Sequence, residues 1–482
     1  MNNQTNVASY EDATNDDLST KFYRAVWRWH FYAGLYVIPF MLMLAITGLL
    51  MMYYNVFETR FGVKPTVEVS GEMLSPNRHY EAAQAAYPNG QITRYIPPAD
   101  ATSAAYVEVV TESHGEDHGG HGGAGHVLSI DPYTNQVLGD VVKDDTIYYL
   151  ANDIHGTLLI GDLGDRLIEV AASLGIVLIV TGLYMWWPRQ GSNFRQVLLP
   201  NLSAKGRALW KDLHVTSGFY ISVILMFFLL SGLAWAGVWG GKFVQPWSSF
   251  PAEKWGMEVP LSDDVHASMN HGALEEVPWG LEQTKMPLSG SDAGITGVAE
   301  GYSIDLSSIT DLAYKIGFGP KFRINLPESE TGVYTITADA WDSDTTDPTA
   351  DRTVHIDQYT GKILGEVGYA DYSLMAKTMA VGTALHQGDM GLWNIILNVV
   401  FCLTVIFLCV SGIVMWWKRR PSKAGRLMAP PMPNNVPLWK GAVAVTLLLS
   451  MAFPLVGISL IIVLFLDLII FQNIKPLKRV LQ

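Results

Sequence analysis

Long apolar stretches separated by polar segments are the main feature of the chain. Four of them cover residues 31–53, 167–187, 215–239 and 392–417. Each is near or above the ~20 residues that an α-helix needs to cross the hydrocarbon core of a bilayer. A fifth apolar region, 441–471, is compatible with one long helix or with a hairpin that turns near Pro454. The pattern predicts a mainly α-helical integral membrane protein.

Lysine and arginine gather in the short segments at alternate ends of these stretches. Such segments stay on the cytoplasmic side, so the two long acidic loops are expected outside. The first nineteen residues carry no basic segment, and no cleavable signal peptide is expected. The predicted organisation is a disordered cytoplasmic N-terminus at 1–20, spans at 21–54, 161–188, 209–240 and 386–418, outer modules at 55–160 and 241–385, cytoplasmic loops at 189–208 and 419–437, a hydrophobic helix or hairpin at 438–472, and a cytoplasmic tail at 473–482.

Composition supports the membrane class. Only 16% of the 482 residues are charged, 49% are hydrophobic, and the mean hydropathy is +0.20, which is too apolar for an ordinary soluble enzyme. The net charge of −13 comes mostly from the two outer loops, and no nucleic-acid partner is expected. Cys402 and Cys409 are the only cysteines, and both lie in the fourth span. No disulfide framework is therefore available to the outer loops.

The first and third spans repeat one motif. His30-x-x-x-Gly34 recurs as His214-x-x-x-Gly218. Each glycine lies one helical turn beyond its histidine and on the same face, where the missing side chain would leave room for a flat ligand. The matching positions predict that these two helices are equivalent members of an internal repeat.

A small hydroxyl residue followed by glycine occurs in all four spans. The pairs are Thr47-Gly48, Thr181-Gly182, Ser231-Gly232 and Ser411-Gly412. Small residues of this kind let helices approach closely, so the pairs are interpreted as packing contacts. The second and fourth spans also follow related loops, in which His155 precedes Asp162-Leu163-Gly164 and His386 precedes Asp389-Met390-Gly391.

The outer loops repeat as well. The segment 130–140, IDPYTNQVLGD, parallels 356–366, IDQYTGKILGE. Each predicts a short strand, a turn and a second strand. The repeating unit is therefore a helix, an outer α+β module and a second helix, present twice with one orientation. Such parallel repeats are related by a two-fold axis along the membrane normal.

This symmetry pairs four of the twelve histidines. His30 would lie opposite His214 near the cytoplasmic face, and His155 opposite His386 near the outer face. Any one of them alone would be explained as an interfacial side chain, but four at matched positions favour a shared role. Two facing neutral imidazoles can supply both axial ligands of a haem iron. A tetrahedral zinc site would need further ligands beside each pair, and none is evident.

The cofactor predicted from these pairs is haem b, with two haems per chain, because the chain contains no Cys-x-x-Cys-His attachment motif. Gly34 and Gly218 would make room for the macrocycle, and Arg24 or Arg28 would meet its propionates. No nucleotide-binding glycine motif follows a strand, and the cytoplasmic loops are too short for a flavin domain. Electrons would come from a cytoplasmic flavoprotein or from membrane quinol.

A second candidate metal site lies in the glycine-rich run 112–126. It contains four histidines, His114, His118, His121 and His126. Tracts of this composition bind borderline metals, although a solvated flexible loop explains the run equally well. His266, His271 and His355 have no partner at ligand spacing and are expected on the surface. Arg166 and Glu169 are three residues apart and are expected to pair.

The combination of these motifs resembles the PepSY-associated transmembrane proteins, also called iron-regulated membrane proteins. The resemblance rests on the histidine–glycine repeats, the loops after His155 and His386, the Met-Trp-Trp runs that end the second and fourth spans, and the two outer repeats. The family includes bacterial inner-membrane siderophore-iron reductases of the FoxB type. It implies two periplasmic PepSY modules over a four-helix core with two b-type haems.

The resemblance implies that His30, His155, His214 and His386 are the haem ligands, and that the substrate is a periplasmic ferric siderophore or another metal chelate. Some relatives carry a fused flavoprotein domain that this chain lacks. Two other hypotheses remain. One is a cofactor-free membrane sensor or scaffold whose PepSY modules bind a peptide or a metal. The other is a permease, which the absence of broken helices and buried charge clusters in the spans disfavours.

Overall fold

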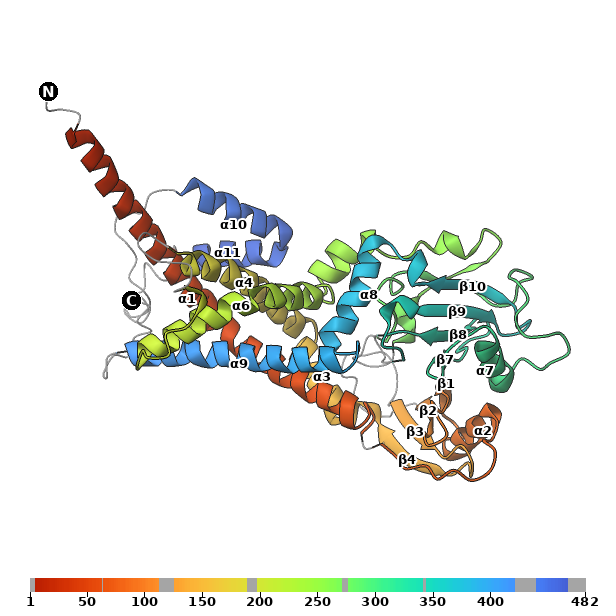
Figure 1. The fold of residues 1–482 in the computed structure, drawn as a ribbon. Coiled ribbons are helices and arrows are strands. Elements are labelled where there is room, and N and C mark those ends of the chain that lie inside the picture. Colours follow the sequence, from red (N-terminus) through yellow and green to blue (C-terminus); the bar gives the residue numbers. More distant parts are fainter. Residues whose placement is uncertain are drawn as a thin grey trace. The chain divides into compact units, whose positions relative to one another are not determined.

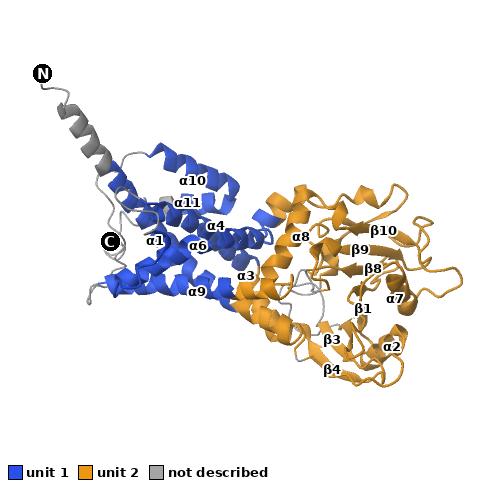
Figure 2. Cartoon of the chain, viewed as in Figure 1, with its two compact units in different colours: residues 1–46, 162–240, 400–482 blue, residues 47–161, 241–399 orange. Residues whose placement is uncertain are grey.

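The computed structural model describes residues 5–62, 64–111, 125–188, 197–270, 276–340, 344–420 and 439–466. The chain divides into two compact units, shown in different colours in Figure 2. Unit 1 comprises residues 1–46, 162–240 and 400–482, and unit 2 comprises residues 47–161 and 241–399.

In the described part of the chain, four long apolar helices lie at the positions of the four predicted spans (Figure 1). They are α1 (Thr5–Phe57), α4 (Asp162–Trp186), α6 (Arg207–Leu233) and α9 (Leu392–Arg419). Each is long and apolar enough to cross a bilayer. Helix α4 packs closely on α6, because Gly175 has no side chain and a Cβ there would lie 3.0 Å from Leu229.

The N-terminal helix is longer than the sequence pattern predicts. It begins at Thr5, whereas residues 1–20 were expected to be disordered. The segment from Thr5 to Ala33 contains neither glycine nor proline, so no residue in it interrupts a helix that continues into the span.

The C-terminal apolar region forms a helical hairpin. Helix α10 (Lys440–Ala452) is followed directly by α11 (Pro454–Leu466), and the turn lies at the predicted proline. In unit 1 the indole of Trp239 donates a hydrogen bond of 2.8 Å to the carbonyl of Ala452 and stacks on Phe453. These contacts attach the turn of the hairpin to the segment that follows α6.

Unit 2 contains one eight-stranded antiparallel sheet in place of two separate modules. Its strand order is β10-β9-β8-β7-β1-β2-β3-β4. The strands are β1 (Gln91–Ile96), β2 (Ala105–Val110), β3 (Gly125–Ile130), β4 (Val137–Val142), β7 (Arg323–Asn325), β8 (Val333–Ala338), β9 (Arg352–Asp357) and β10 (Ile363–Gly368). Pairing of β1 with β7 joins two four-stranded halves into this single sheet. The chain therefore combines the long helices with a substantial antiparallel sheet.

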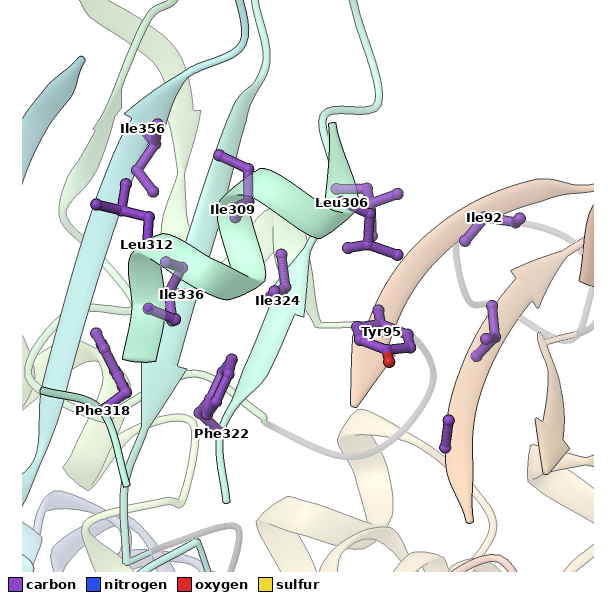
Figure 3. Close-up of a cluster of buried hydrophobic side chains, with 14 of the residues drawn as sticks. Ile92, Tyr95, Leu306, Ile309, Leu312, Phe318, Phe322, Ile324, Ile336 and Ile356 are labelled. Atoms are coloured by element: carbon purple, nitrogen blue, oxygen red, sulfur yellow. The ribbon is translucent and has the colours of Figure 1, made fainter. Parts of the chain in front are cut away.

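Each half of the sheet carries one helix, α2 (Pro76–Ala86) or α7 (Leu306–Lys315). Both helices contribute to one buried apolar cluster, which Figure 3 shows around Tyr95, Ile309, Phe322 and Ile336. Because the cluster draws residues from both halves, its burial stabilises the two repeats as a single unit.

The two predicted hairpins are confirmed, and their turns have the same geometry. In the β3–β4 turn, Asp131 accepts the backbone N–H groups of Tyr133 and Thr134. In the β9–β10 turn, Asp357 accepts those of Tyr359 and Thr360. Four residues after each aspartate the backbone is left-handed, at Asn135 (φ 62°) and at Gly361 (φ 65°). The sequence repeat is therefore also a repeat of backbone geometry.

The remaining elements of unit 2 connect the sheet to the long helices along the chain. Helix α3 (Ile147–Thr157) precedes α4, and α8 (Leu374–Gln387) precedes α9. A second, two-stranded sheet pairs β5 (Leu261–Val265) with β6 (Lys285–Pro287). Helices α3 and α8 carry His155 and His386, respectively.

Candidate functional site

His30 lies on α1 against the hydroxyl–glycine pair of α4. Its Nδ1 is 2.8 Å from Oγ1 of Thr181. A Cβ on Gly182 would lie 3.4 Å from Cε1 of the imidazole. The hydroxyl therefore bonds one ring nitrogen, and the adjacent glycine leaves the space that the ring needs.

His214 repeats this arrangement between α6 and α9. Its Nδ1 is 2.7 Å from Oγ of Ser411. A Cβ on Gly412 would lie 3.9 Å from Cε1 of the ring. The hydroxyl–glycine pairs were expected to be packing contacts, but in these two helices they are also partners of the histidines.

The hydroxyl groups determine which nitrogen of each imidazole carries the proton. Thr181 Oγ1 lies 2.6 Å from the carbonyl oxygen of Val177, and Ser411 Oγ lies 2.9 Å from that of Leu408. A hydroxyl has one hydrogen, and a carbonyl can only accept it. Each hydroxyl oxygen must then accept from Nδ1–H of the histidine. The lone pair of Nε2 remains available, which is the state that a metal-ligating histidine requires.

A cavity of about 520 Å³ lies among the four long helices within unit 1, and both His30 and His214 line it. Gly34 and Gly218 line it as well. The lining is almost entirely apolar and contains no carboxylate. The volume falls in the usual range of ~300–1,000 Å³ for ligand pockets. Two imidazoles with free Nε2 atoms, glycine-lined walls and an apolar interior fit a flat, iron-bearing macrocycle.

The cationic side chains at this cavity are not those predicted. Arg207 and Arg419 line it, whereas Arg24 and Arg28 do not. Arg24 is exposed, and the guanidinium of Arg28 lies 4.9 Å from the ring centre of Tyr32. Which cations reach the cavity depends on the rotation of each helix about its axis.

Aromatic side chains hold Arg419 beside the cavity. Its guanidinium lies 5.2 Å from the ring centres of both Trp27 and Phe31, which also line the cavity. Stacking of this kind orients the guanidinium without neutralising its charge. Together with Arg207, it gives the cavity a positive end.

His155 shows the same histidine–hydroxyl–glycine arrangement in unit 2. Its Nδ1 is 2.8 Å from Oγ1 of Thr47, and a Cβ on Gly48 would lie 3.8 Å from its Cε1. His155 and His386 are close enough for the charge of one to affect the other. The structure therefore brings together the second predicted pair of histidines.

Two buried asparagines hold the backbone at His386. Asn398 Nδ2 donates to the carbonyl oxygens of Leu385 (2.9 Å) and His386 (3.0 Å), and Asn394 Nδ2 donates to that of Leu385 (2.9 Å). Both asparagines are at most 1% exposed. The sequence contains a signal for this role, because two amide side chains one turn apart in an apolar span are energetically costly unless they have hydrogen-bonding partners.

His266 and His355 are fully buried, although both were expected on the surface. Their Nε2 atoms are 2.9 Å apart. His266 Nδ1 lies 2.7 Å from the carbonyl oxygen of Thr284, to which it can only donate, and His355 Nδ1 lies 3.0 Å from the hydroxyl of Thr335. His355 Nε2–H therefore donates to His266 Nε2, and both rings are neutral and satisfied.

Acidification is expected to destabilise unit 2 through this pair. Burial lowers the pKa of His266 from 6.5 to about 4, and burial together with the neighbouring His266 holds the pKa of His355 well below its usual range. The unfolded chain takes up these protons first, so stability present above pH 6.5 is lost as the pH falls towards 4. The loss is roughly 3 kcal/mol for His266. Thermal unfolding of wild type and of the double variant His266→Gln/His355→Gln from pH 7 to 4 checks this, because the variant should show the shallower dependence.

The histidine-rich candidate site lies mostly outside the described residues. His271 also lies outside them. His114, His118 and His121 belong to 112–124, which the structure does not describe. His126 is described, on β3, with Asp140 and Tyr87 as hydrogen-bonding partners. Within the described part of the chain, no three histidine, cysteine or carboxylate side chains converge as a metal site would require.

The predicted pair of Arg166 and Glu169 is confirmed, with 3.7 Å between Nη1 and Oε2. Glu169 also accepts the backbone N–H groups of Val238 and Trp239, at 3.1 Å and 3.0 Å. Its charge is thus used to satisfy the backbone just after α6, in the segment that continues as a short π-helix (Trp239–Val244). This is a structural role in unit 1.

One comparison with known proteins identifies the family. A comparison with curated proteins gives no match. A family model described as the PepSY-associated TM region matches residues 27–419, a range that contains all four histidines of the two predicted pairs and both halves of the sheet. This is most of the chain, and the chain therefore belongs to the family of proteins with a PepSY-associated transmembrane region.

Proposed function

We propose that the protein is an inner-membrane oxidoreductase that holds two b-type haems and reduces ferric siderophore in the periplasm, so that iron is released as Fe(II). Membership of the PepSY-associated family and four long apolar helices support the membrane part of this proposal. The haem part rests on one observation, the repeated histidine–hydroxyl–glycine arrangement in which His30 and His214 line one apolar cavity with Nε2 free.

Different residues would ligate the iron, leave space for the macrocycle and bind its propionates. His30 and His214 would supply axial nitrogens at one level, and His155 and His386 at the other. Gly34 and Gly218 leave space beside the first pair. Arg207 and Arg419 would bind the propionate carboxylates, because charge-assisted bonds to guanidinium are strong in an apolar site. When bound, haem supplies a one-electron couple.

The hydroxyl partners tune the ligands. A hydroxyl that accepts from Nδ1–H fixes both the ring orientation and the tautomer of His30 and His214. The apolar lining excludes water from the ring nitrogens and keeps both imidazoles neutral. Asn394 and Asn398 hold the backbone from which His386 projects.

Reduction is a suitable chemistry for releasing siderophore iron. Hard oxygen-donor chelators hold Fe(III) far more tightly than Fe(II), so the transfer of one electron weakens the complex without breaking the chelator. The electron donor would be a cytoplasmic flavoprotein or membrane quinol. A cofactor-free sensor or scaffold is the alternative, and a folded protein without haem would favour it.

Replacing Thr181 by valine is expected to weaken haem binding at His30 by roughly 10–100-fold. This is the usual effect of removing the group that hydrogen-bonds the other ring nitrogen of a metal-ligating histidine. The variant keeps the shape of the side chain and removes the acceptor for Nδ1–H, together with the hydroxyl's bond to the carbonyl of Val177. The matched control is Thr404→Val, because Thr404 also donates to the carbonyl four residues earlier, that of Val400 in α9, but is half-buried and has no histidine partner among its described bonds. Haem titration followed by absorbance measures the affinity. Equal affinities in the two variants would contradict the assigned role of Thr181.

The function is tested in sealed vesicles that contain the purified protein with dithionite trapped inside and a ferric hydroxamate siderophore outside. Fe(II) captured by an external coloured chelator should appear many-fold faster than in protein-free vesicles. The variant His30→Ala should reduce this rate to the protein-free level. A haem-loaded wild type that gives only the protein-free rate would rule out ferric siderophore as a substrate.

A further inference from the structure

Three donor side chains converge on the first half of the sheet, at the end of the histidine-rich run. Tyr87 directly follows α2, His126 lies at the start of β3, and Asp140 lies on β4. The phenol oxygen of Tyr87 is 2.5 Å from Oδ2 of Asp140 and 2.7 Å from Nδ1 of His126. His126 Nδ1 is 3.0 Å from Oδ1 of Asp140.

These distances match the spacing of ligands around one metal ion. Metal bonds to nitrogen and oxygen ligands of ~2.0–2.2 Å place neighbouring ligand atoms about 3 Å apart. The phenol oxygen lies within 3.0 Å of both other residues, and His126 Nδ1 lies 3.0 Å from Oδ1 of Asp140, so a single ion above the triangle would contact one donor from each residue.

We propose that Tyr87, His126 and Asp140 bind a ferric ion. Two of the three donors are hard oxygens, a phenolate and a carboxylate, which suit a hard and highly charged ion. On binding, the phenol O–H loses its proton to solvent and an Fe–O bond forms, with no change in oxidation state. Tyrosinate is an established protein ligand of iron.

The site leaves room for further ligands. The side chain of His126 is 19% exposed and that of Asp140 is 42% exposed, so one side of the triangle faces solvent. Three protein donors occupy half of an octahedral coordination sphere, and water or oxygen atoms of a chelator would complete it. The substrate class is therefore Fe(III) in a labile or partly displaced complex.

A purely structural role is the competing explanation. Without metal, the phenol can donate to Asp140 and the imidazole can donate to either oxygen, and these bonds connect the end of α2 to the β3–β4 hairpin. The two explanations differ in what happens when Fe(III) is offered. The binding measurement needs no electron transfer, so its outcome is independent of the proposed reductase activity.

The test uses the full-length oxidised protein in nanodiscs. Fe(III) is supplied as its nitrilotriacetate complex, and unbound iron is removed by gel filtration. Wild type should retain one non-haem iron per chain, with a rhombic high-spin electron paramagnetic resonance signal and phenolate bands in resonance Raman spectra. The variant Tyr87→Phe should lose the phenolate bands and bind at least tenfold more weakly. The control Tyr133→Phe should match wild type, because Tyr133 donates to the carbonyl of Ala101 outside the triangle.

The proposal is overturned if wild type retains no non-haem iron, or if Tyr87→Phe binds iron as wild type does, as it would if residues elsewhere held the ion. Tighter binding of Cu(II) or Zn(II) than of Fe(III) in the same assay would overturn the choice of metal. Thermal unfolding of Tyr87→Phe checks that the fold is intact. If that variant does not fold, His126→Gln takes its place, with the same loss of affinity expected.

Discussion

Replacing His30 by alanine is expected to leave a folded protein with one haem in place of two. His30 lines the cavity of unit 1 with His214, and the pair would supply both axial ligands of one haem. A small apolar side chain at this position removes one ligand without adding bulk or charge to an apolar cavity. The haem-to-protein ratio, measured from the absorbance of the pyridine complex, should fall by half.

The identity of the haem lost in each histidine variant tests the assigned pairs. His214→Ala should remove the same haem as His30→Ala, and the double variant should lose no more than either single one. His386→Ala should remove the other haem. His126→Ala is the matched control, because His126 lies on the sheet outside the helices, and it should keep both haems. Retention of two haems by His30→Ala, or loss of the same haem in His30→Ala and His386→Ala, would contradict the assigned pairs.

Replacing Glu276 by alanine is expected to destabilise unit 2 by about 3–5 kcal/mol, the usual cost of removing one member of a buried ionic network. Glu276 lies 2.7 Å from both Arg94 and Lys143, and these two cations also contact Glu108, at 3.5 Å and 3.1 Å. All four side chains are at most 5% exposed. The variant would leave two buried cations with a single carboxylate.

The protonation state of Glu276 agrees with this network. Burial raises the pKa of the carboxyl group, but Arg94 and Lys143 outweigh burial and hold the pKa well below its usual range. Glu276 is therefore charged, and removing it leaves the positive charges of Arg94 and Lys143 only partly balanced. Unfolding followed by circular dichroism measures the change in stability.

Glu81→Ala is the control for this experiment. Glu81 pairs with Arg78 on the surface, where the two side chains are 58% and 57% exposed. Exposed pairs contribute at most ~1 kcal/mol, so this variant should unfold close to wild type. Similar stabilities of the two variants would show that the buried network does not hold the sheet together.

The parts of the fold that the sequence predicts are those set by local patterns. The four spans follow from apolar length, and the turns at Asp131 and Asp357 follow from a repeated segment. The pairing of β1 with β7 has no such local signal, because it joins residues more than 200 positions apart. Two separate modules were therefore expected where the structure has one sheet.

The candidate site divides in the same way. The histidines and glycines at repeated positions were identifiable, but the partner of each imidazole lies on another helix, and Thr181 is 151 residues from His30. Packing was the natural interpretation of the hydroxyl–glycine pairs while that partner was unknown. His266 and His355 were assigned to the surface because neither has a local partner, yet they meet each other across 89 residues.

The presence of two haems is tested most directly by the absorption spectrum of the purified full-length protein, oxidised and then reduced with dithionite. We expect two haem b per chain, both low-spin with two histidine ligands, and a Soret band that shifts on reduction. A folded preparation without a Soret band would contradict it.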